Sequence, residues 1–346
     1  MKAAFWAGVG LMLLSPAVKA ATVIIQNADP AGQGLNDPTA FTPVGGNNAT
    51  TLGAARLNVL NEAAATWGAR LTSAVPIHVS VQMTALPCSA NSAVLGTTGA
   101  TTIHRDFPSA PRAATWYPQA LANALAGTDL DPSTPEIEGL FNGALGSAGC
   151  LTGVTFYLGL DGHPGANQID LLTIELHELS HGLGFQSYTD FTTGAERSGI
   201  DDAFLVNMQQ AGVTPAALTA MTDAQREAAA TSDPNLYWAG SAVQAAASTL
   251  SAGLIAGHVR LYAPATFSPG SSVAHYSTAA TPNQLMEPFY TGPTRDLALT
   301  QALLRDVGWA LVAQPVGVPG MPPAGRALLA LALLGAGLVV ARAPRN

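Results

Sequence analysis

Apolar residues recur at helical spacing through residues 169–185, which read IDLLTIELHELSHGLGF. Leucines follow one another at steps of four, three and four: Leu172, Leu176, Leu179 and Leu183. This is the spacing of an α-helix with one buried face. Asp170 can cap the start of such a helix, and two glycines near residue 184 are typical of its C-terminal end. The pattern therefore predicts a largely buried helix that ends near Gly184.

The chain before this helix alternates between strand-like and helix-like patterns. We expect strands over 22–26, 76–86 and 154–160, and helices over 52–73, 118–126 and 137–143. The pattern weakens between Cys88 and Pro118, where we expect loop. Elements of both kinds leading up to Gly184 predict an α/β lobe.

Beyond Gly184 the predicted elements are mostly short helices. We expect helices over 200–211, 222–230 and 241–253, a short strand over 259–262, and a last helix that ends near Trp309. Thr222 and Gln225 have the spacing of a capping box at the start of the second of these helices. This second part is mainly helix and loop, so the predicted fold class is α+β.

The chain of 346 residues is long enough for one large or two modest lobes. Lys and Arg total 14 against 22 Asp and Glu, which gives a formal net charge of −8. A nucleic-acid partner is not expected, because binding to phosphates requires a basic surface.

The N-terminal residues 1–20 have a positive start, an apolar stretch and small residues before Ala21. These features are typical of a signal peptide cleaved after Ala20, so we expect an exported protein at the cell surface, in a periplasm or secreted. Two cysteines suit that oxidising compartment, and we expect a disulfide between Cys88 and Cys150 rather than two free thiols.

The C-terminal part divides into a Pro/Gly/Val linker over 314–325 and a hydrophobic segment over 326–346. The segment contains an unbroken run of apolar residues and glycine over 327–341, followed by arginines. At about 1.5 Å per residue this run falls short of the roughly 30 Å hydrocarbon core. The tail resembles the C-terminal sorting signals of bacterial surface proteins and implies association with a membrane; a buried terminal helix is the alternative.

Two histidines and a glutamate lie within the predicted helix. His177 and His181 are one turn apart, so both imidazoles project from one face, as the first two protein ligands of a zinc ion do. Glu178 lies beside the first histidine, where a carboxylate can take a proton from a water on the metal. Burying these polar groups on an apolar helix is costly unless something satisfies them. We therefore interpret the segment as a metal site.

A catalytic zinc usually has three protein ligands, so a third is required. The longer signature His-Glu-x-x-His-x-x-Gly-x-x-His would place it at residue 187, which is Ser187. The downstream candidates are His258, His275 and, as a carboxylate ligand, Glu196.

Residues 275–288 read HYSTAATPNQLMEP and place Met286 in a Pro-flanked turn. Together with the His-Glu-x-x-His-x-x-Gly-Phe segment over 177–185, this arrangement resembles the leishmanolysin-like branch of the metzincin zinc peptidases. That branch has a long insertion between the helix and a histidine shortly before a Met-turn. The sequence departs from it because no propeptide with a zinc-blocking cysteine fits between Ala21 and the first predicted strand.

The resemblance implies a role for each matching residue. The implied Zn²⁺ ligands are His177, His181 and His275, the general base is Glu178, the turn is Gly184, and the platform beneath the metal is Met286. It further implies a two-lobed metzincin-like fold, with an α/β catalytic lobe over 21–184 and a mainly helical and loop lobe over 185–313. Tyrosines reach the metal in some metzincins, and Tyr276 and Tyr290 are the candidates here.

The predicted function is that of an exported zinc-dependent endopeptidase acting on protein or peptide substrates. Two other functions stay open on the sequence. One is a surface binding or adhesion protein with a vestigial zinc site, against which the intact Glu178 argues. The other is a zinc hydrolase that cleaves a non-peptide bond.

Overall fold

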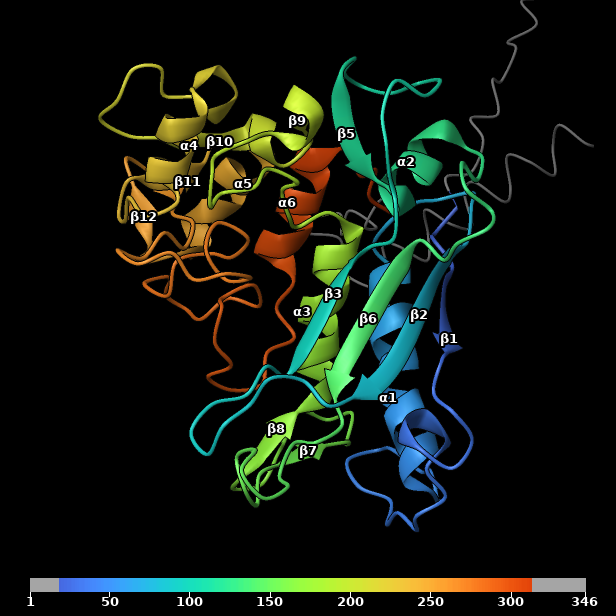
Figure 1. Ribbon diagram of the computed structural model, residues 1–346. Coiled ribbons are helices and arrows are strands. Elements are labelled where there is room, and N and C mark those ends of the chain that lie inside the picture. Colours follow the sequence, from blue (N-terminus) through green and yellow to red (C-terminus); the bar gives the residue numbers. More distant parts are fainter. Residues whose placement is uncertain (1–18, 313–346) are drawn as a thin grey trace, which may run out of the picture. The chain divides into compact units, whose positions relative to one another are not determined.

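The structure is a computed structural model that describes residues 19–312 (Figure 1). All but the last two residues of the predicted signal peptide, the predicted linker and the predicted C-terminal segment lie outside the described residues. Helices, a main sheet and several small sheets make up the chain, so the α+β fold class is confirmed.

The main sheet has the strand order β1–β2–β6–β3. Three strands run parallel: β1 (Val23–Asn27), β2 (Ile77–Thr84) and β6 (Ile137–Asn142). The fourth, β3 (Gly96–Ala100), lies antiparallel to β6 at the edge, with Thr98 opposite Gly139. Apolar side chains of the central strands are buried on one face: Ile77, Val79, Val81, Ile137 and Phe141.

Two helices cover that buried face of the sheet, α1 (Leu52–Gly68) and α3 (Leu171–Leu183) (Figure 1). Thr51 caps α1 by accepting a hydrogen bond from the Ala54 N–H. Trp67 of α1 is fully buried, and its indole N–H donates to the Leu176 carbonyl of α3 at 3.1 Å. The helix α3, which carries the predicted metal ligands, therefore packs against both the sheet and α1.

Short elements surround this central part. The remaining strands are β4 (Ile103–His104), β5 (Thr115–Pro118) and β9 (Asp201–Asp202) in one sheet, and the pairs β7 (Thr155–Tyr157) with β8 (Gln168–Asp170), β10 (Met208–Gln210) with β11 (Leu236–Trp238), and β12 (Leu254–Ile255) with β13 (His258–Val259). The remaining α-helices are α2 (Gln119–Ala126), α4 (Asp223–Ala229), α5 (Ser241–Ala246) and α6 (Ala298–Val307). The predicted capping box of Thr222 and Gln225 is present at the start of α4.

The helix predicted over 137–143 is wrong, because these residues form β6 in the middle of the sheet. Ile137, Gly139 and Phe141 point to the buried side at every second position. In a segment this short the apolar pattern fits either period, and pairing with two neighbouring strands decides the outcome.

The helix predicted over 200–211 is also wrong. The carboxylate of Asp202 accepts hydrogen bonds from the N–H groups of Phe204 and Leu205, which keeps the chain in a tight turn. The following residues then pair as β10 with β11. The stretch from Cys88 to Pro118 likewise contains β3, β4 and β5 rather than loop alone.

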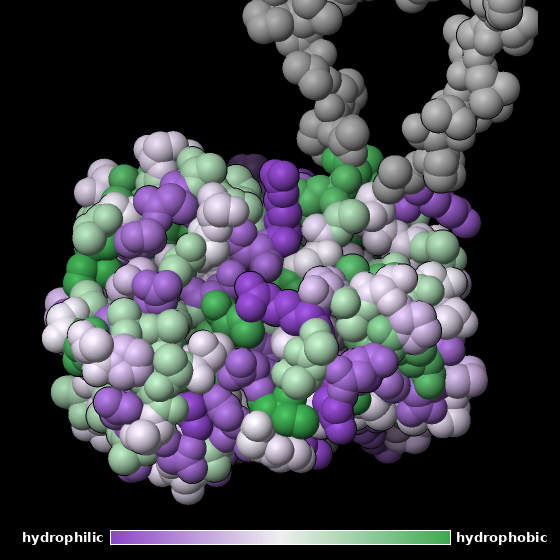
Figure 2. Space-filling model, turned by 90° about the horizontal axis from the view of Figure 1, so that it is seen from above, coloured by the Kyte–Doolittle hydropathy of each residue, from purple (hydrophilic) through white to green (hydrophobic). Residues whose placement is uncertain are grey.

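The predicted disulfide between Cys88 and Cys150 is confirmed, with Cα atoms 5.1 Å apart. Within residues 19–312, no helix has both the length and the apolar character needed to cross a membrane. Seen from above, the described surface intermingles hydrophilic and hydrophobic residues (Figure 2).

Candidate metal centre

Helix α3 provides two of the three histidines of the candidate site. Asp170 caps its start, where the carboxylate accepts a hydrogen bond of 2.8 Å from the Thr173 N–H. The helix ends at Gly184, whose φ of 124° is strained for any residue with a side chain. The predicted helix and the predicted turn at Gly184 are both confirmed.

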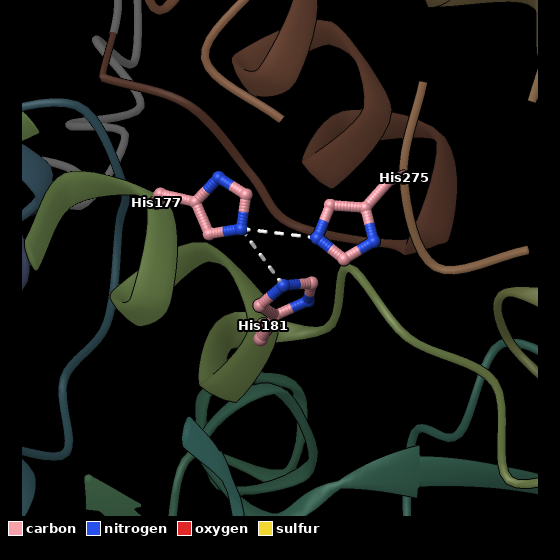
Figure 3. A group of neighbouring side chains, drawn as sticks. All are labelled: His177, His181 and His275. Carbon is pink, nitrogen blue, oxygen red and sulfur yellow. Dashed lines mark hydrogen bonds between the residues drawn. The ribbon is translucent and has the colours of Figure 1, made fainter. Parts of the chain in front are cut away.

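Three imidazoles converge at the C-terminal half of α3 (Figure 3). Nε2 of His177 lies 3.2 Å from Nε2 of His181 and 3.1 Å from Nε2 of His275. His275 comes from a loop 98 residues further along the chain than His177. The structure thus brings together the three histidines that the family resemblance selected.

The other ring nitrogen of each histidine faces a backbone carbonyl. Nδ1 of His177 lies 2.7 Å from the Leu285 oxygen, Nδ1 of His181 lies 2.9 Å from the Phe185 oxygen, and Nδ1 of His275 lies 2.8 Å from the Ser271 oxygen. A carbonyl oxygen has no proton to give, so each Nδ1 carries the proton and donates it. Each neutral imidazole therefore presents an unprotonated Nε2 to the shared centre.

Burial keeps these imidazoles neutral. It lowers the pKa of His177 to about 4 and that of His181 to about 3, and it lowers the pKa of His275 well below the usual value. Neutral imidazole is the form that binds metal, so no proton has to be displaced at pH 7.

The three nitrogens fit a metal ion. With no proton among the three Nε2 atoms, their lone pairs repel one another. A bound cation would attract all three lone pairs and remove this repulsion. Tetrahedral coordination with Zn–N bonds of 2.0–2.1 Å separates two ligand nitrogens by about 3.3 Å. The separations of 3.1 and 3.2 Å are close to that value. The buried cluster is thus arranged to bind a metal ion.

The side chain of Glu178 extends from α3 toward β3. The residue is only 7% exposed, and burial raises the pKa of its carboxyl group to about 8. The Thr98 hydroxyl is close enough to offset part of this rise, although the two groups do not have the geometry of a full hydrogen bond. A cation at the three imidazoles would favour the carboxylate form of Glu178, because an opposite charge lowers a carboxyl pKa.

The segment around Met286 lies behind the histidines. The Leu285 carbonyl accepts a hydrogen bond from Nδ1 of His177. The Met286 carbonyl accepts a 2.8 Å hydrogen bond from the N–H of Tyr276, the residue after His275. The Met286 side chain is fully buried. This turn therefore connects the α3 ligands to the loop that carries the third histidine.

The alternative third ligands lie elsewhere. His258 is on β13, where its ring stacks on Tyr237 with centroids 4.7 Å apart. Glu196 pairs with Arg226 at 3.0 Å. Neither belongs to the cluster of three histidines.

The two tyrosines also have other partners. Tyr276 is fully buried, and its hydroxyl donates to the Leu299 carbonyl at 3.0 Å. The Tyr290 hydroxyl accepts a hydrogen bond of 3.1 Å from the Asp170 N–H, at the opposite end of α3 from His181.

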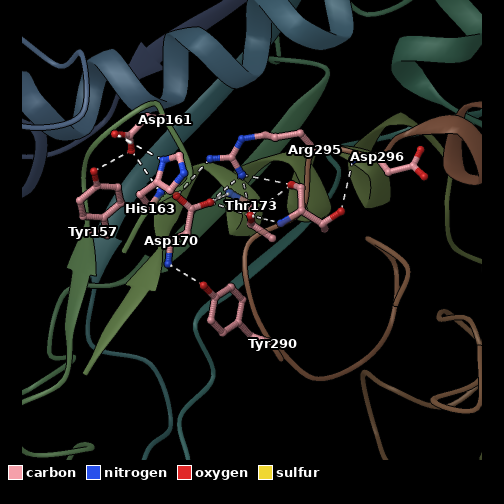
Figure 4. A network of polar contacts seen from close by, with 9 residues as sticks. Tyr157, Asp161, His163, Asp170, Thr173, Tyr290, Arg295 and Asp296 are labelled. Carbon is pink, nitrogen blue, oxygen red and sulfur yellow. Dashed lines mark hydrogen bonds and ion pairs between the residues drawn. The ribbon is translucent and has the colours of Figure 1, made fainter. Parts of the chain in front are cut away.

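A network of polar side chains fixes the start of α3 (Figure 4). Arg295 pairs with both carboxylate oxygens of Asp170, at 2.6 and 3.1 Å, and also donates to the Thr173 hydroxyl at 2.7 Å. The Asp170 side chain is completely buried. The segment from Leu285 to Arg295 contacts α3 through its first and its last residue, at His177 and Asp170 respectively. These two contacts fix the helix against the turn that carries Met286.

We expect Asp170→Ala to lower the free energy of unfolding by about 2–4 kcal/mol. The substitution removes the helix cap and leaves Arg295 without its partner, although Arg295 is 35% exposed and can recover hydration. Urea denaturation measures the change. The matched control is Thr51→Ala, which removes the cap of α1 without breaking an ion pair and is expected to cost about 1 kcal/mol. Equal losses in the two variants would contradict the role given to the ion pair.

Sequence reasoning missed Gly96, which contacts Glu178. A Cβ added to Gly96 would lie 2.9 Å from Glu178 Cγ. The residue falls in the stretch that we expected to be loop. Its strand reads Gly-Thr-Thr-Gly-Ala, so the pair of β-branched threonines was the available signal.

Comparison with known proteins adds no relative. No family model matches the chain, no curated protein matches it, and no solved structure matches it.

Proposed function

We propose that this protein is a zinc-dependent endopeptidase with a two-lobed fold similar to that of the leishmanolysin-like metzincins. The observation that carries the proposal is the convergence of three imidazole Nε2 atoms, two of them from the helix that also carries the buried Glu178. A purely structural metal site requires no such carboxylate. The turn at Met286, directly behind the ligands, supports the same assignment.

Zinc bound at His177, His181 and His275 supplies positive charge that polarises a scissile carbonyl and acidifies water. Glu178 lies about 60° around the helix from His181, which suits a general base acting next to the ligands. Its carboxylate takes a proton from the attacking water and passes it to the nitrogen of the departing amine. The buried surroundings of Glu178 strengthen these interactions by excluding bulk water.

The edge strand β3 offers a place for the substrate backbone. One side of β3 pairs with β6, and its other side has no strand partner among the described residues. An extended peptide can add to such an edge through main-chain hydrogen bonds. Gly96 on this strand contacts Glu178, so a peptide bound there runs beside the catalytic group.

We also propose that the protein acts outside the cytoplasm. The disulfide between Cys88 and Cys150 supports this location, because disulfides persist in oxidising compartments.

Metal analysis combined with digestion of fluorescein-labelled casein tests the proposed function. We expect one zinc per chain, casein cleavage, loss of cleavage after treatment with 1,10-phenanthroline, and its return when zinc is added back. Bound zinc without cleavage of casein or of a peptide library would instead support the binding protein or the hydrolase of a non-peptide bond. Cleavage that persists in protein shown to be free of metal would refute the assignment.

A further inference from the structure

The helix α3 approaches the main sheet closely at two points, and a glycine lies at each. A Cβ added to Gly182 of α3 would come within 2.5 Å of the Ile137 side chain of β6. A Cβ added to Gly96 of β3 would lie 2.9 Å from Cγ of Glu178 and 3.1 Å from both Cδ and Oε1. Carbon atoms in ordinary contact are about 3.5–4.0 Å apart, so neither position has room for a side chain.

The requirement for glycine at position 96 comes from space rather than from backbone conformation. Gly96 is not among the residues with positive φ, so its backbone suits alanine as well. The strand is also fixed, because Gly96 pairs with Phe141 of β6 and the neighbouring Leu95 carbonyl accepts a 3.0 Å hydrogen bond from the Asn142 N–H. An added methyl group must therefore displace the side chain of Glu178 rather than the strand.

We propose that Gly96 is a positioning residue for Glu178: the missing side chain at position 96 leaves the space in which the glutamate carboxylate is held beside the metal ligands. The inference rests on the proposed role of Glu178 as general base. It goes further by assigning the placement of that base to the edge strand. The three heavy atoms nearest to the added Cβ all belong to Glu178, so we expect the metal ligands to stay in place when alanine replaces Gly96.

The activity of Gly96→Ala tests this role, with Gly143→Ala as the control. Gly143 directly follows β6, away from the proposed substrate strand, and its φ is not positive. Its added Cβ would meet only backbone atoms of Met83 and Thr84, at ordinary distances of 3.4 and 3.5 Å. We expect Gly96→Ala to keep one metal per chain and a KM for fluorescein-labelled casein within about threefold, while kcat falls by about 10²-fold, because a misplaced catalytic group costs that much. Gly143→Ala should keep its kcat. A kcat within threefold of wild type in Gly96→Ala overturns the proposal.

Thermal unfolding of four full-length proteins tests the contact without relying on activity. These are the wild type, Gly96→Ala, Glu178→Ala and the double variant. We expect Gly96→Ala to lower the Tm by about 2–5 °C in the wild-type background and to leave it unchanged when Glu178→Ala has removed the opposing atoms. Poor folding of the single variant that the second substitution rescues also supports the proposal. An equal loss in both backgrounds overturns it.

The two measurements separate this inference from the proposed function. If the wild type cleaves no protein substrate, the proposed peptidase function fails, while the melting experiment still reports whether Gly96 sets the place of Glu178. If casein is cleaved but the Tm changes are equal in both backgrounds, the peptidase function stands and the positioning role of Gly96 fails.

Discussion

Replacing Glu178 with glutamine is expected to leave the metal bound and to lower kcat for casein hydrolysis by about 10²–10⁴-fold. Glutamine has nearly the same shape and fits the same buried space, but its amide cannot accept a proton from water. The three imidazoles are unchanged, so metal content should equal that of the wild type. Metal analysis and initial rates on the same preparation measure both quantities.

Glu175→Gln is the control for this substitution. Glu175 is also buried on α3, one turn before Glu178, and does not belong to the metal-binding cluster. We expect this variant to keep both its metal and its kcat. Hydrolysis at near wild-type rates by fully metallated Glu178→Gln would show that another group moves the proton.

Replacing His275 with alanine is expected to weaken metal binding by more than about 10²-fold and to abolish casein hydrolysis. Loss of an outer partner of a metal ligand typically costs 10–100-fold in affinity, so loss of a ligand itself should cost more. Titration against a competing chelator measures the dissociation constant, and metal content after gel filtration gives the stoichiometry.

His258→Ala is the control, because His258 was the alternative histidine ligand on the sequence. In the structure it stacks on Tyr237 outside the cluster, so the variant should bind metal like the wild type. Retention of one tightly bound metal by His275→Ala, or its loss in His258→Ala, would contradict the proposed ligand set.

Two local patterns on α3 predicted from the sequence the candidate-site residues that this helix carries. The leucine spacing predicted the helix, and the helix period then placed His177 and His181 on one face. The turn at Gly184 followed from the same local rules. Local patterns were not enough to predict His275 as the third ligand. Its choice over His258 and Glu196 depended on the family resemblance of the segment around Met286.

Errors in the predicted fold fall where pairing between distant segments decides the structure. Residues 137–142 form a central strand because β2 and β3 pair with them, although a six-residue apolar pattern also fits a helix turn. The strand β3 carries glycines and threonines with little apolar periodicity, and its two adjacent threonines were too weak a local signal to identify it. Its position against α3 nevertheless gives Gly96 its proposed role.

Local rules alone were enough to predict the helix of the candidate site, its two histidines and the neighbouring glutamate, because 3.6 residues per turn fix which side chains of one helix lie together. The folded chain adds His275 to the cluster and places a backbone carbonyl against each of the three rings. It also brings the edge strand β3 against Glu178. These features depend on contacts between segments far apart in the chain, and no local period encodes such contacts.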